Sequence, residues 1–314
     1  MEIIARYGKE DLAVLYLARM KNNYILEFVE SLQPPFPREE KWVIIVSTLF
    51  GCPIRCPICD AGSNYKGIIS SEELFQQVDY IIGKRFPSRK IPVPKFKIQF
   101  ARMGEPAFNL NVLDILEKLP QIYDAPGLMP CISTIAPKGR EQFFERLIDL
   151  KNRFYARGKF QLQFSIHSTE EGRRNFLIPA KKWSFTEIAR YGECFYRPGD
   201  RKITLNFALT RGYPVDPEVI SYYFNPEFFL IKITPLNPTA QVIKNKLSSF
   251  FGPDDTSICP ELIEQFEYRD YEVILSPGEP EENRIGSNCG QYVTCYETQK
   301  LKKGLYETEK YTIY

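Results

Sequence analysis

Histidine is almost missing from this chain of 314 residues, which carries only His167. Zinc sites and acid–base sites usually draw on several histidines, so chemistry of those kinds is disfavoured. No charge of either sign dominates, because 41 lysines and arginines stand against 39 acidic residues. The sequence therefore lacks the basic field with which many proteins attract nucleic acid. Eight cysteines are present instead, and we expect any chemistry to run through sulfur.

Long apolar stretches are absent as well. The chain does not start with a basic segment followed by an apolar core, and no apolar run approaches the roughly 20 residues that cross a bilayer. We therefore expect a cytoplasmic protein, in which cysteines act as ligands, nucleophiles or core residues rather than as disulfides. The ordinary fractions of hydrophobic and charged residues, 44% and 25%, exclude a disordered chain and a coiled-coil rod.

The middle of the chain alternates between strand-like and helix-like segments. Short runs of β-branched and aromatic residues predict strands at 42–47, 96–101, 130–134, 160–166, 202–209 and 228–234. Helix-like segments lie between most of them, at 71–83, 112–119, 140–152, 184–194 and 216–223. Repeated strand–helix units favour a parallel sheet with right-handed crossovers. Six units rather than eight predict an α/β fold built as a partial (β/α)6 barrel.

Short extensions flank this barrel. Two strand-like segments, 12–20 and 24–32, predict a β-hairpin ahead of a proline-rich linker at 33–37. After the sixth barrel strand we expect a helix at 260–266, a strand at 271–275 and a loop at 276–286. The sequence thus divides into a short N-terminal β extension and linker (1–40), a partial barrel (41–240) and a C-terminal extension (241–314).

Three of the cysteines directly follow the first barrel strand. Cys52, Cys56 and Cys59 have the spacing CxxxCxxC, on a loop at the carboxyl end of that strand, where (β/α) barrels build their active sites. Three thiolates can bind three irons of a 4Fe-4S cluster and leave the fourth iron open to a substrate. The alternatives are a zinc knuckle without its fourth ligand and a coincidental spacing.

This loop resembles the signature of the radical SAM superfamily. The resemblance implies a 4Fe-4S cluster whose open iron binds the amino and carboxylate groups of S-adenosylmethionine. It also implies an external electron donor of the flavodoxin or ferredoxin type, since reductive cleavage of S-adenosylmethionine yields a 5′-deoxyadenosyl radical. The cofactors carry this chemistry, and the protein positions and shields them.

Further segments are similar to those of one subfamily, the RlmN and Cfr (class A) methylases. They stand in the family's order at predicted strand ends, and they comprise Met103-Gly104-Glu105-Pro106, Ser133-Thr134, Phe164-Ser165-Ile166-His167, Arg174 and Asn237-Pro238. The resemblance implies that Gly104, Glu105, Ser133, His167 and Asn237 lie at the S-adenosylmethionine site. A carboxylate such as Glu105 can accept hydrogen bonds from an ammonium group. His167 has a second interpretation, as a buried structural histidine.

One more match concerns the mechanism. Ser287-Asn288-Cys289-Gly290-Gln291 is similar to the segment that carries the methyl-carrier cysteine of these methylases. The resemblance implies that Cys289 takes a methyl group from one S-adenosylmethionine and that a radical from a second one activates it for addition to an sp2 carbon. A thiol can be methylated by simple displacement, whereas an aromatic amidine carbon is too poor a nucleophile. An ordinary buried thiol is the alternative for Cys289.

The chain departs from the family at two points. Ile45 stands seven residues before Cys52, where the methylases have a cysteine that resolves the covalent adduct. Cys131 or Cys295 could replace that thiol, because Cys131 precedes Ser133 by two strand positions and should face the same way. A small core residue is the other interpretation of Cys131. Cys194 and Cys259 look structural.

The second departure concerns the substrate. The RNA methylases have a helical RNA-binding domain before the barrel. In this chain, residues 1–40 precede the barrel and read as a β-hairpin and linker instead. The net charge of +2 provides little general attraction to phosphate backbones. RNA, a nucleotide-like small molecule and a peptide therefore all stay open as substrates. Two rival functions also remain: a radical SAM enzyme that works without a cysteine carrier, and a non-catalytic metal-binding or RNA-binding module.

Overall fold

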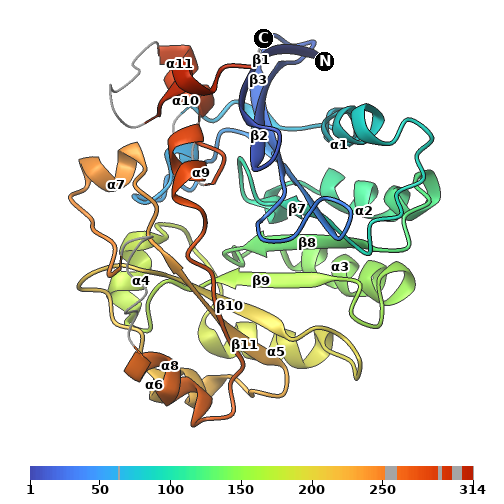
Figure 1. Ribbon diagram of the computed structural model, residues 1–314. Coiled ribbons are helices and arrows are strands. Elements are labelled where there is room, and N and C mark those ends of the chain that lie inside the picture. The colour runs from blue at the N-terminus through green and yellow to red at the C-terminus, as the bar shows by residue number, and fades with distance from the viewer. Residues whose placement is uncertain (63, 252–259, 289–291, 299–305, 314) are drawn as a thin grey trace.

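A curved ten-stranded sheet organises the molecule (Figure 1). The computed structural model describes residues 1–62, 64–251, 260–288, 292–298 and 306–313. The strand order is β1-β2-β3-β4-β7-β8-β9-β10-β11-β12, and every pair from β4 to β12 is parallel. These parallel strands are β4 (Lys41–Val46), β7 (Lys95–Phe100), β8 (Leu128–Thr134), β9 (Gln161–Ser165), β10 (Ile203–Leu209), β11 (Phe229–Pro235) and β12 (Val273–Leu275). The predicted partial barrel is confirmed, and β1 and β12 are its open edges among the described strands.

Each parallel strand divides its side chains between two environments. In β7, Phe96, Ile98 and Phe100 are buried in the main core, whereas Lys95 and Lys97 are half-buried on the opposite, concave face. Successive side chains of a strand point to opposite faces of the sheet, so each strand contributes side chains both to the core and to the concave face. Figure 1 shows helices on the convex face, and the core on this side includes residues of α1 (Ser71–Arg85), α2 (Asn111–Ile122), α3 (Glu141–Phe154), α5 (Phe185–Phe195) and α6 (Pro217–Tyr223).

Two of these helices begin with the same local signal. Ser70 caps α1 by accepting a hydrogen bond from the backbone of Glu73, whose side chain accepts one in return. Ser184 and Glu187 form an identical capping box at α5. Such a box satisfies two amide donors that a helix start leaves free, which is why the serines fix the starts of both helices.

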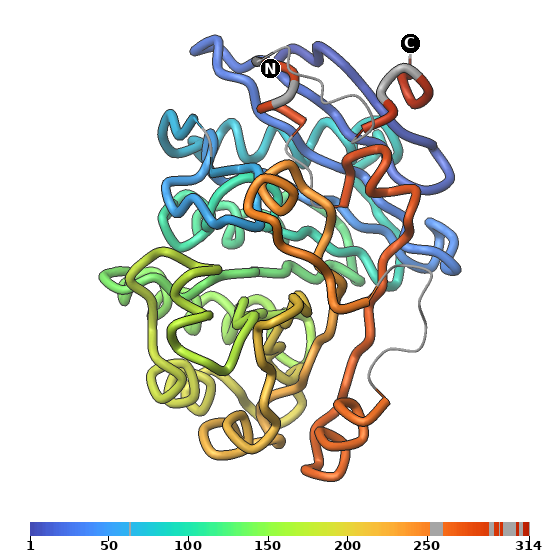
Figure 2. The backbone as a smooth tube through the Cα atoms, turned by 90° about the vertical axis from the view of Figure 1, so that its left-hand side faces the viewer, coloured from blue at the N-terminus to red at the C-terminus, as the bar shows by residue number. Residues whose placement is uncertain are grey.

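The N-terminal residues extend the same sheet with antiparallel strands. β2 (Ala13–Arg19) pairs with β3 (Ile25–Ser31), which confirms the predicted hairpin, and β3 pairs with β4. The sequence analysis missed β1 (Glu2–Lys9), which pairs with β2 and forms an isolated bridge to Thr312. Figure 2 shows the last elements of the chain beside these first strands, and a second core cluster joins the two regions. The beginning and the end of the chain thus stabilise each other.

The C-terminal region differs from the prediction in one segment. The helix predicted at 260–266 is α8 (Pro260–Glu267) and the strand predicted at 271–275 is β12. The segment 276–286 was predicted to be a loop but contains α9 (Pro280–Ile285), because proline suits the first turn of a helix and Gly286 ends the helix in a left-handed conformation. Short elements complete the chain: β5 (Leu49–Phe50), β6 (Gly67–Ile68), η1 (Asp60–Gly62), η2 (Pro106–Phe108), α4 (Glu171–Leu177), α7 (Ala240–Lys244), α10 (Tyr292–Thr298) and α11 (Thr308–Tyr311). Among the described residues, no helix is long and apolar enough to cross a membrane.

Candidate functional site

The three clustered cysteines lie between β5 and η1, at the carboxyl end of the first parallel strand. Cys52 is buried, and Cys56 and Cys59 are half-buried. They belong to one apolar cluster together with side chains from the neighbouring loops, Ile54, Ile135, Leu177 and Ile178. The cysteine loop is therefore shielded from water on several sides by hydrophobic residues.

The donor set of this loop fits an iron–sulfur cluster. Burial raises the pKa of Cys52 to about 11 and that of Cys56 to about 12, so these two thiols would stay neutral in the bare loop. Positively charged irons would supply the counter-charge that thiolate ligands need here. In the part of the chain that the structure describes, no three His, Cys, Asp or Glu side chains converge on the position of a single ion. A cluster spreads its ligands over several irons, whereas a zinc knuckle gathers them around one.

Asp60, directly after the last cysteine, connects this loop to the sixth barrel unit. Its two carboxylate oxygens accept hydrogen bonds from the backbone of Ala240 (3.0 Å) and Gln241 (2.8 Å), at the start of α7. Thr239 adds a hydrogen bond to the carbonyl of Ile58. Sequence reasoning missed Asp60, although an acidic residue following the motif is a detectable signal.

The segment Met103-Gly104-Glu105 lies against the start of the cysteine loop. The backbone amides of Thr48 and Leu49 both donate to the carbonyl of Met103. Gly104 has a positive φ of 96°, and a Cβ there would lie 2.5 Å from the Leu49 side chain. Only glycine allows this close approach of two loops.

Glu105 is buried, with 4% of its surface exposed. Its carboxylate accepts hydrogen bonds from the hydroxyl of Thr134 and from the backbone amides of Ile135 (2.9 Å) and Ala107 (3.1 Å). Burial nevertheless raises the pKa of Glu105 to about 7. Thr134 orients this carboxylate, while its neighbour Ser133 is half-buried at the end of β8.

His167 follows β9 and adopts a left-handed backbone conformation, with φ of 64°. Its Nδ1 accepts a hydrogen bond from the amide of Ala208 at 3.1 Å. Burial, and to a smaller extent the charge of Arg174, lower the pKa of His167 to about 4. The imidazole is therefore neutral at physiological pH, with its proton on Nε2.

Asn237 follows β11 and brings the C-terminal extension to this end of the sheet. Its Oδ1 accepts a hydrogen bond from the side chain of Asn288 at 3.4 Å. Asn288 directly precedes Cys289, which lies outside the described residues. The neighbour of the predicted methyl carrier thus contacts a residue predicted to bind the cofactor.

A buried ion pair holds both flanks of residues 289–291. Arg102 Nε lies 2.7 Å from Glu27 Oε1, and both side chains are almost fully buried. The same guanidinium donates to the carbonyls of Gly286 and Ser287, while Glu27 accepts from the amide of Val293. Arg102 precedes Gly104 by two residues, so the clamp joins the Gly-Glu-Pro loop to the segment around Cys289. Sequence reasoning missed this pair; the one hint was an acidic residue inside an apolar strand.

The candidate resolving thiols occupy different regions. Cys131 is buried in β8, where its sulfur lies 3.7 Å from Gln161 Oε1. Burial raises its pKa, while the charges of Lys97 and three other basic side chains oppose that rise. Cys295 belongs to α10, but its side chain lies outside the described part. Cys259 is also outside it, and Cys194 is exposed in α5.

Comparison with characterised proteins gives relatives in sequence and in structure. The chain is 28% identical over 225 residues to a probable dual-specificity RNA methyltransferase RlmN of Chlorobium phaeobacteroides (strain BS1), covering 66% of this chain and 56% of that protein. It is 26% identical over 181 residues to the RlmN of Synechococcus sp. (strain CC9311), covering 56% and 49%. The chain thus spans about half the length of the curated relatives it matches. No family model matches it.

Solved structures share the fold. A radical SAM methyltransferase from Sphaerobacter thermophilus superposes with a TM-score of 0.68 at 16% identity, over 92% of this chain and 80% of that one. SuiB of Streptococcus suis, bound to S-adenosylmethionine, gives 0.52 at 11% identity, over 77% and 51%. Sequence and fold together confirm the resemblance to the radical SAM methyltransferases that the motifs predicted.

Proposed function

We propose that this protein is a radical SAM methyltransferase that uses a cysteine methyl carrier. Cys52, Cys56 and Cys59 would hold a 4Fe-4S cluster. Cys289 would carry the methyl group to an sp2 carbon of the substrate. The observation that carries the proposal is the Arg102 clamp. Arg102 stands two residues before Gly104, and its guanidinium holds the carbonyls of Gly286 and Ser287, which precede Cys289 in the chain.

The bound cluster and S-adenosylmethionine, with an electron from a flavodoxin or ferredoxin type donor, would supply the radical chemistry. The chain's own residues would bind and orient the cluster and S-adenosylmethionine. Gly104 keeps the loop close to β5, and Glu105 offers a buried carboxylate to the ammonium of S-adenosylmethionine. His167 presents Nε2–H, because Ala208 occupies Nδ1. Ser133 and Asn237 add polar contacts at neighbouring strand ends.

Cys289 would act first as a nucleophile. Its thiolate attacks the methyl carbon of S-adenosylmethionine, a sulfur–carbon bond forms, and the bond from that carbon to the sulfonium breaks to release S-adenosylhomocysteine. Once the carried carbon is bonded to the substrate, the thiolate of Cys131 or Cys295 would attack the sulfur of Cys289. A disulfide would form, the bond from the Cys289 sulfur to the carried carbon would break, and that carbon would keep the electron pair and take up a proton as the new methyl group. Residues on both sides of Cys289 are anchored, because Asn288 contacts Asn237 and the amide of Val293 donates to Glu27.

RNA is the first substrate to test, because the relatives compared above are named as probable dual-specificity RNA methyltransferases. The second candidate is a radical SAM enzyme that modifies a small molecule or peptide without a cysteine carrier. Ile45 favours it, since β4 has no thiol where the family's resolving cysteine would stand.

A cysteine variant separates the two. Anaerobically reconstituted protein should be brown, contain about four irons, and transfer methyl groups from S-adenosylmethionine to an RNA acceptor. Cys289→Ala should keep the iron and lose methyl transfer, whereas the matched control Cys194→Ala, at an exposed position, should keep both. Undiminished product formation by Cys289→Ala would contradict the carrier role and favour the second candidate.

A further inference from the structure

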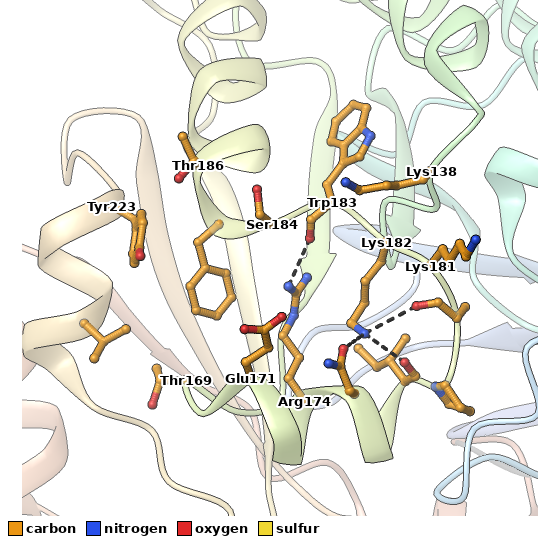
Figure 3. A pocket seen from close by; sticks show the side chains of 16 residues that line it. Lys138, Thr169, Glu171, Arg174, Lys181, Lys182, Trp183, Ser184, Thr186 and Tyr223 are labelled. Atoms are coloured by element: carbon orange, nitrogen blue, oxygen red, sulfur yellow. Dashed lines mark hydrogen bonds between the residues drawn. The ribbon is translucent and has the colours of Figure 1, made fainter.

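A cavity of about 740 Å³ lies beside α4 and the start of α5 (Figure 3). Four of the side chains that line it are cationic and one, Glu171, is anionic. The cations are Lys138, Arg174, Lys181 and Lys182. Figure 3 shows Arg174 in the middle of this group, with Lys182 on one side and Tyr223 on the other. The lining therefore carries a clear excess of positive charge.

Arg174 is the unusual member of the lining. Only 6% of its surface is exposed, and its Nη1 donates to the carbonyl of Trp183 at 3.0 Å. Its Nε and Nη2 are buried and have no hydrogen-bond partner among the described residues. Native proteins pair nearly all buried donors, so an unpaired edge of a guanidinium indicates a missing acceptor.

The guanidinium is also held in place. Its carbon lies 4.8 Å from the centre of the Phe185 ring, and burial lowers the pKa of Arg174 to about 10, which leaves it charged at neutral pH. Glu171 forms no ion pair with it in the described part of the chain. The charge of Glu171 acts on Arg174 without a direct ion pair, so Arg174 is an oriented cation whose Nε and Nη2 have no acceptor in the described part of the chain.

The neighbouring lysines differ in the hydrogen bonds and ion pairs that their ammonium groups form within the protein. Lys182 donates to Asn175 Oδ1 (2.7 Å) and to the carbonyl of Ile178 (2.9 Å), so it is a fixed part of the wall. Lys138 pairs with Glu187 at 3.3 Å. Lys181 is exposed and has no ion pair among the described residues. The pocket therefore offers the fixed guanidinium of Arg174 and the exposed ammonium of Lys181.

The pocket shares a wall with the candidate cofactor site. Ile178 lines the cavity and also packs in the apolar cluster of Cys52. Lys182 is close enough to Cys56 for its charge to act on that thiol. A ligand in the pocket would therefore lie against the cysteine loop.

We propose that this pocket binds a phosphate group of the substrate, through the Nε and Nη2 edge of Arg174. This proposal rests on the proposed function. Two parallel N–H donors match two phosphate oxygens, and a doubly charged or polymeric anion suits the excess of cations. Tyr223, partly exposed at the pocket, could stack on an attached base. The phosphate could be the monoester of a nucleotide or the diester of an RNA chain.

Binding measurements on the anaerobic holoprotein test this. The probes are 5′-AMP and a fluorescein-labelled oligoribonucleotide, titrated against wild type, Arg174→Gln and the matched control Arg173→Gln. Arg173 is the adjacent, exposed arginine on α4, paired with Glu170 and absent from the pocket lining. Loss of a bidentate charged contact should weaken binding at least about tenfold in Arg174→Gln, while Arg173→Gln should change it by less than about twofold.

The two probes distinguish the source of the phosphate. If 5′-AMP and the oligonucleotide bind with equal affinity and both depend on Arg174, the site is assigned to a small phosphorylated substrate. If only binding of the oligonucleotide depends on Arg174, the site is assigned to RNA. Equal binding of both probes by wild type and Arg174→Gln overturns the proposal. Should Arg174→Gln fail to fold, Lys181→Gln at the exposed lysine should weaken binding about two- to fivefold; no change there overturns it as well.

Failure of this inference differs from failure of the proposed function. Methylation of Cys289 by S-adenosylmethionine does not require the substrate, so it should proceed in Arg174→Gln. Methylation without Arg174-dependent phosphate binding would overturn only the pocket. Arg174-dependent binding without Cys289 methylation would overturn only the carrier mechanism.

Discussion

Two arginines of this molecule are equally buried and differ in nearly everything else. Arg102 and Arg174 are each 6% exposed. Arg102 finds a buried carboxylate, Glu27, at 2.7 Å and two backbone carbonyls. Arg174 has one carbonyl partner and two nitrogens without an acceptor in the described part of the chain. The first lies within the packed junction of β3, the Gly-Glu-Pro loop and α9, and the second lines a cavity.

The difference distinguishes an arginine that stabilises the structure from an arginine that can bind a ligand. A buried cation whose counter-charge is in the chain holds segments together, here the strand with Glu27 and the segment before Cys289. A buried cation with unpaired donors costs stability unless a ligand supplies the acceptor. Arg102 therefore positions the site, and Arg174 is available to bind. The predictions below test this division, beginning with the largest effect.

Removing each guanidinium should have unequal effects on stability. Arg102→Met leaves the buried carboxyl of Glu27, whose pKa burial raises, without its cationic partner, and should lower the free energy of unfolding by about 3–5 kcal/mol. Arg174→Met removes one hydrogen bond but also two unpaired donors, and should change it by less than about 1 kcal/mol. Urea unfolding followed by circular dichroism measures both. Equal losses would contradict the comparison.

His167 should make stability depend on pH. Its folded pKa of about 4 lies below the unfolded value of 6.5, so the unfolded chain binds the proton first as pH falls. The contribution of His167 to the free energy of unfolding is fully present above pH 6.5. About 3 kcal/mol of it is lost as the pH falls from 6.5 to 4. Glu105 acts in the opposite direction, because its pKa is raised. The difference between wild type and His167→Asn isolates the histidine, and parallel pH profiles for the two proteins would refute the assignment. Asparagine tolerates the left-handed backbone.

Replacing the whole ion pair should restore most of the stability. Glu27→Leu combined with Arg102→Met leaves no uncompensated charge, so the double variant should unfold within about 1–2 kcal/mol of wild type. It should still methylate Cys289 more slowly, because the carbonyls of Gly286 and Ser287 lose their donors. Full stability together with the wild-type methylation rate would show that Arg102 does not position this segment.

The smallest expected effect concerns the electrostatic interaction between Arg174 and His167. The charge of Arg174 contributes to the low pKa of His167, after desolvation. In Arg174→Met the pKa should rise but stay below 6.5, and the loss of stability between pH 6.5 and 4 should shrink. Arg173→Gln, which alters the exposed neighbour, is the control. An unchanged pH profile in Arg174→Met would contradict the electrostatic coupling.

Local patterns predicted much of this molecule. The alternation of strands and helices, the α1 start at Ser70 and the hairpin of β2 and β3 are confirmed because propensity, capping and register act over a few residues. The cysteine spacing and the Gly-Glu-Pro motif pointed to two loops that the structure holds together through Met103.

Long-range partners escaped prediction. Glu27, Arg102 and Ser287 meet through three distant segments, and no periodicity marks such a contact. The two unpaired nitrogens of Arg174 depend on how α4 and α5 pack, which a motif match at this arginine does not reveal. The helix α9 was missed because Pro280 and the flanking Gly278 and Gly286 favoured a loop in the sequence pattern.

The most direct test of the central claim is isotopic labelling of Cys289. Reconstituted protein is incubated with S-adenosylmethionine that carries a deuterated methyl group, digested, and analysed by mass spectrometry. The account predicts a labelled carbon on Cys289 in wild type and in Cys194→Ala. Four-iron protein that cleaves S-adenosylmethionine but carries no label on Cys289, or carries it only on another cysteine, would contradict the account.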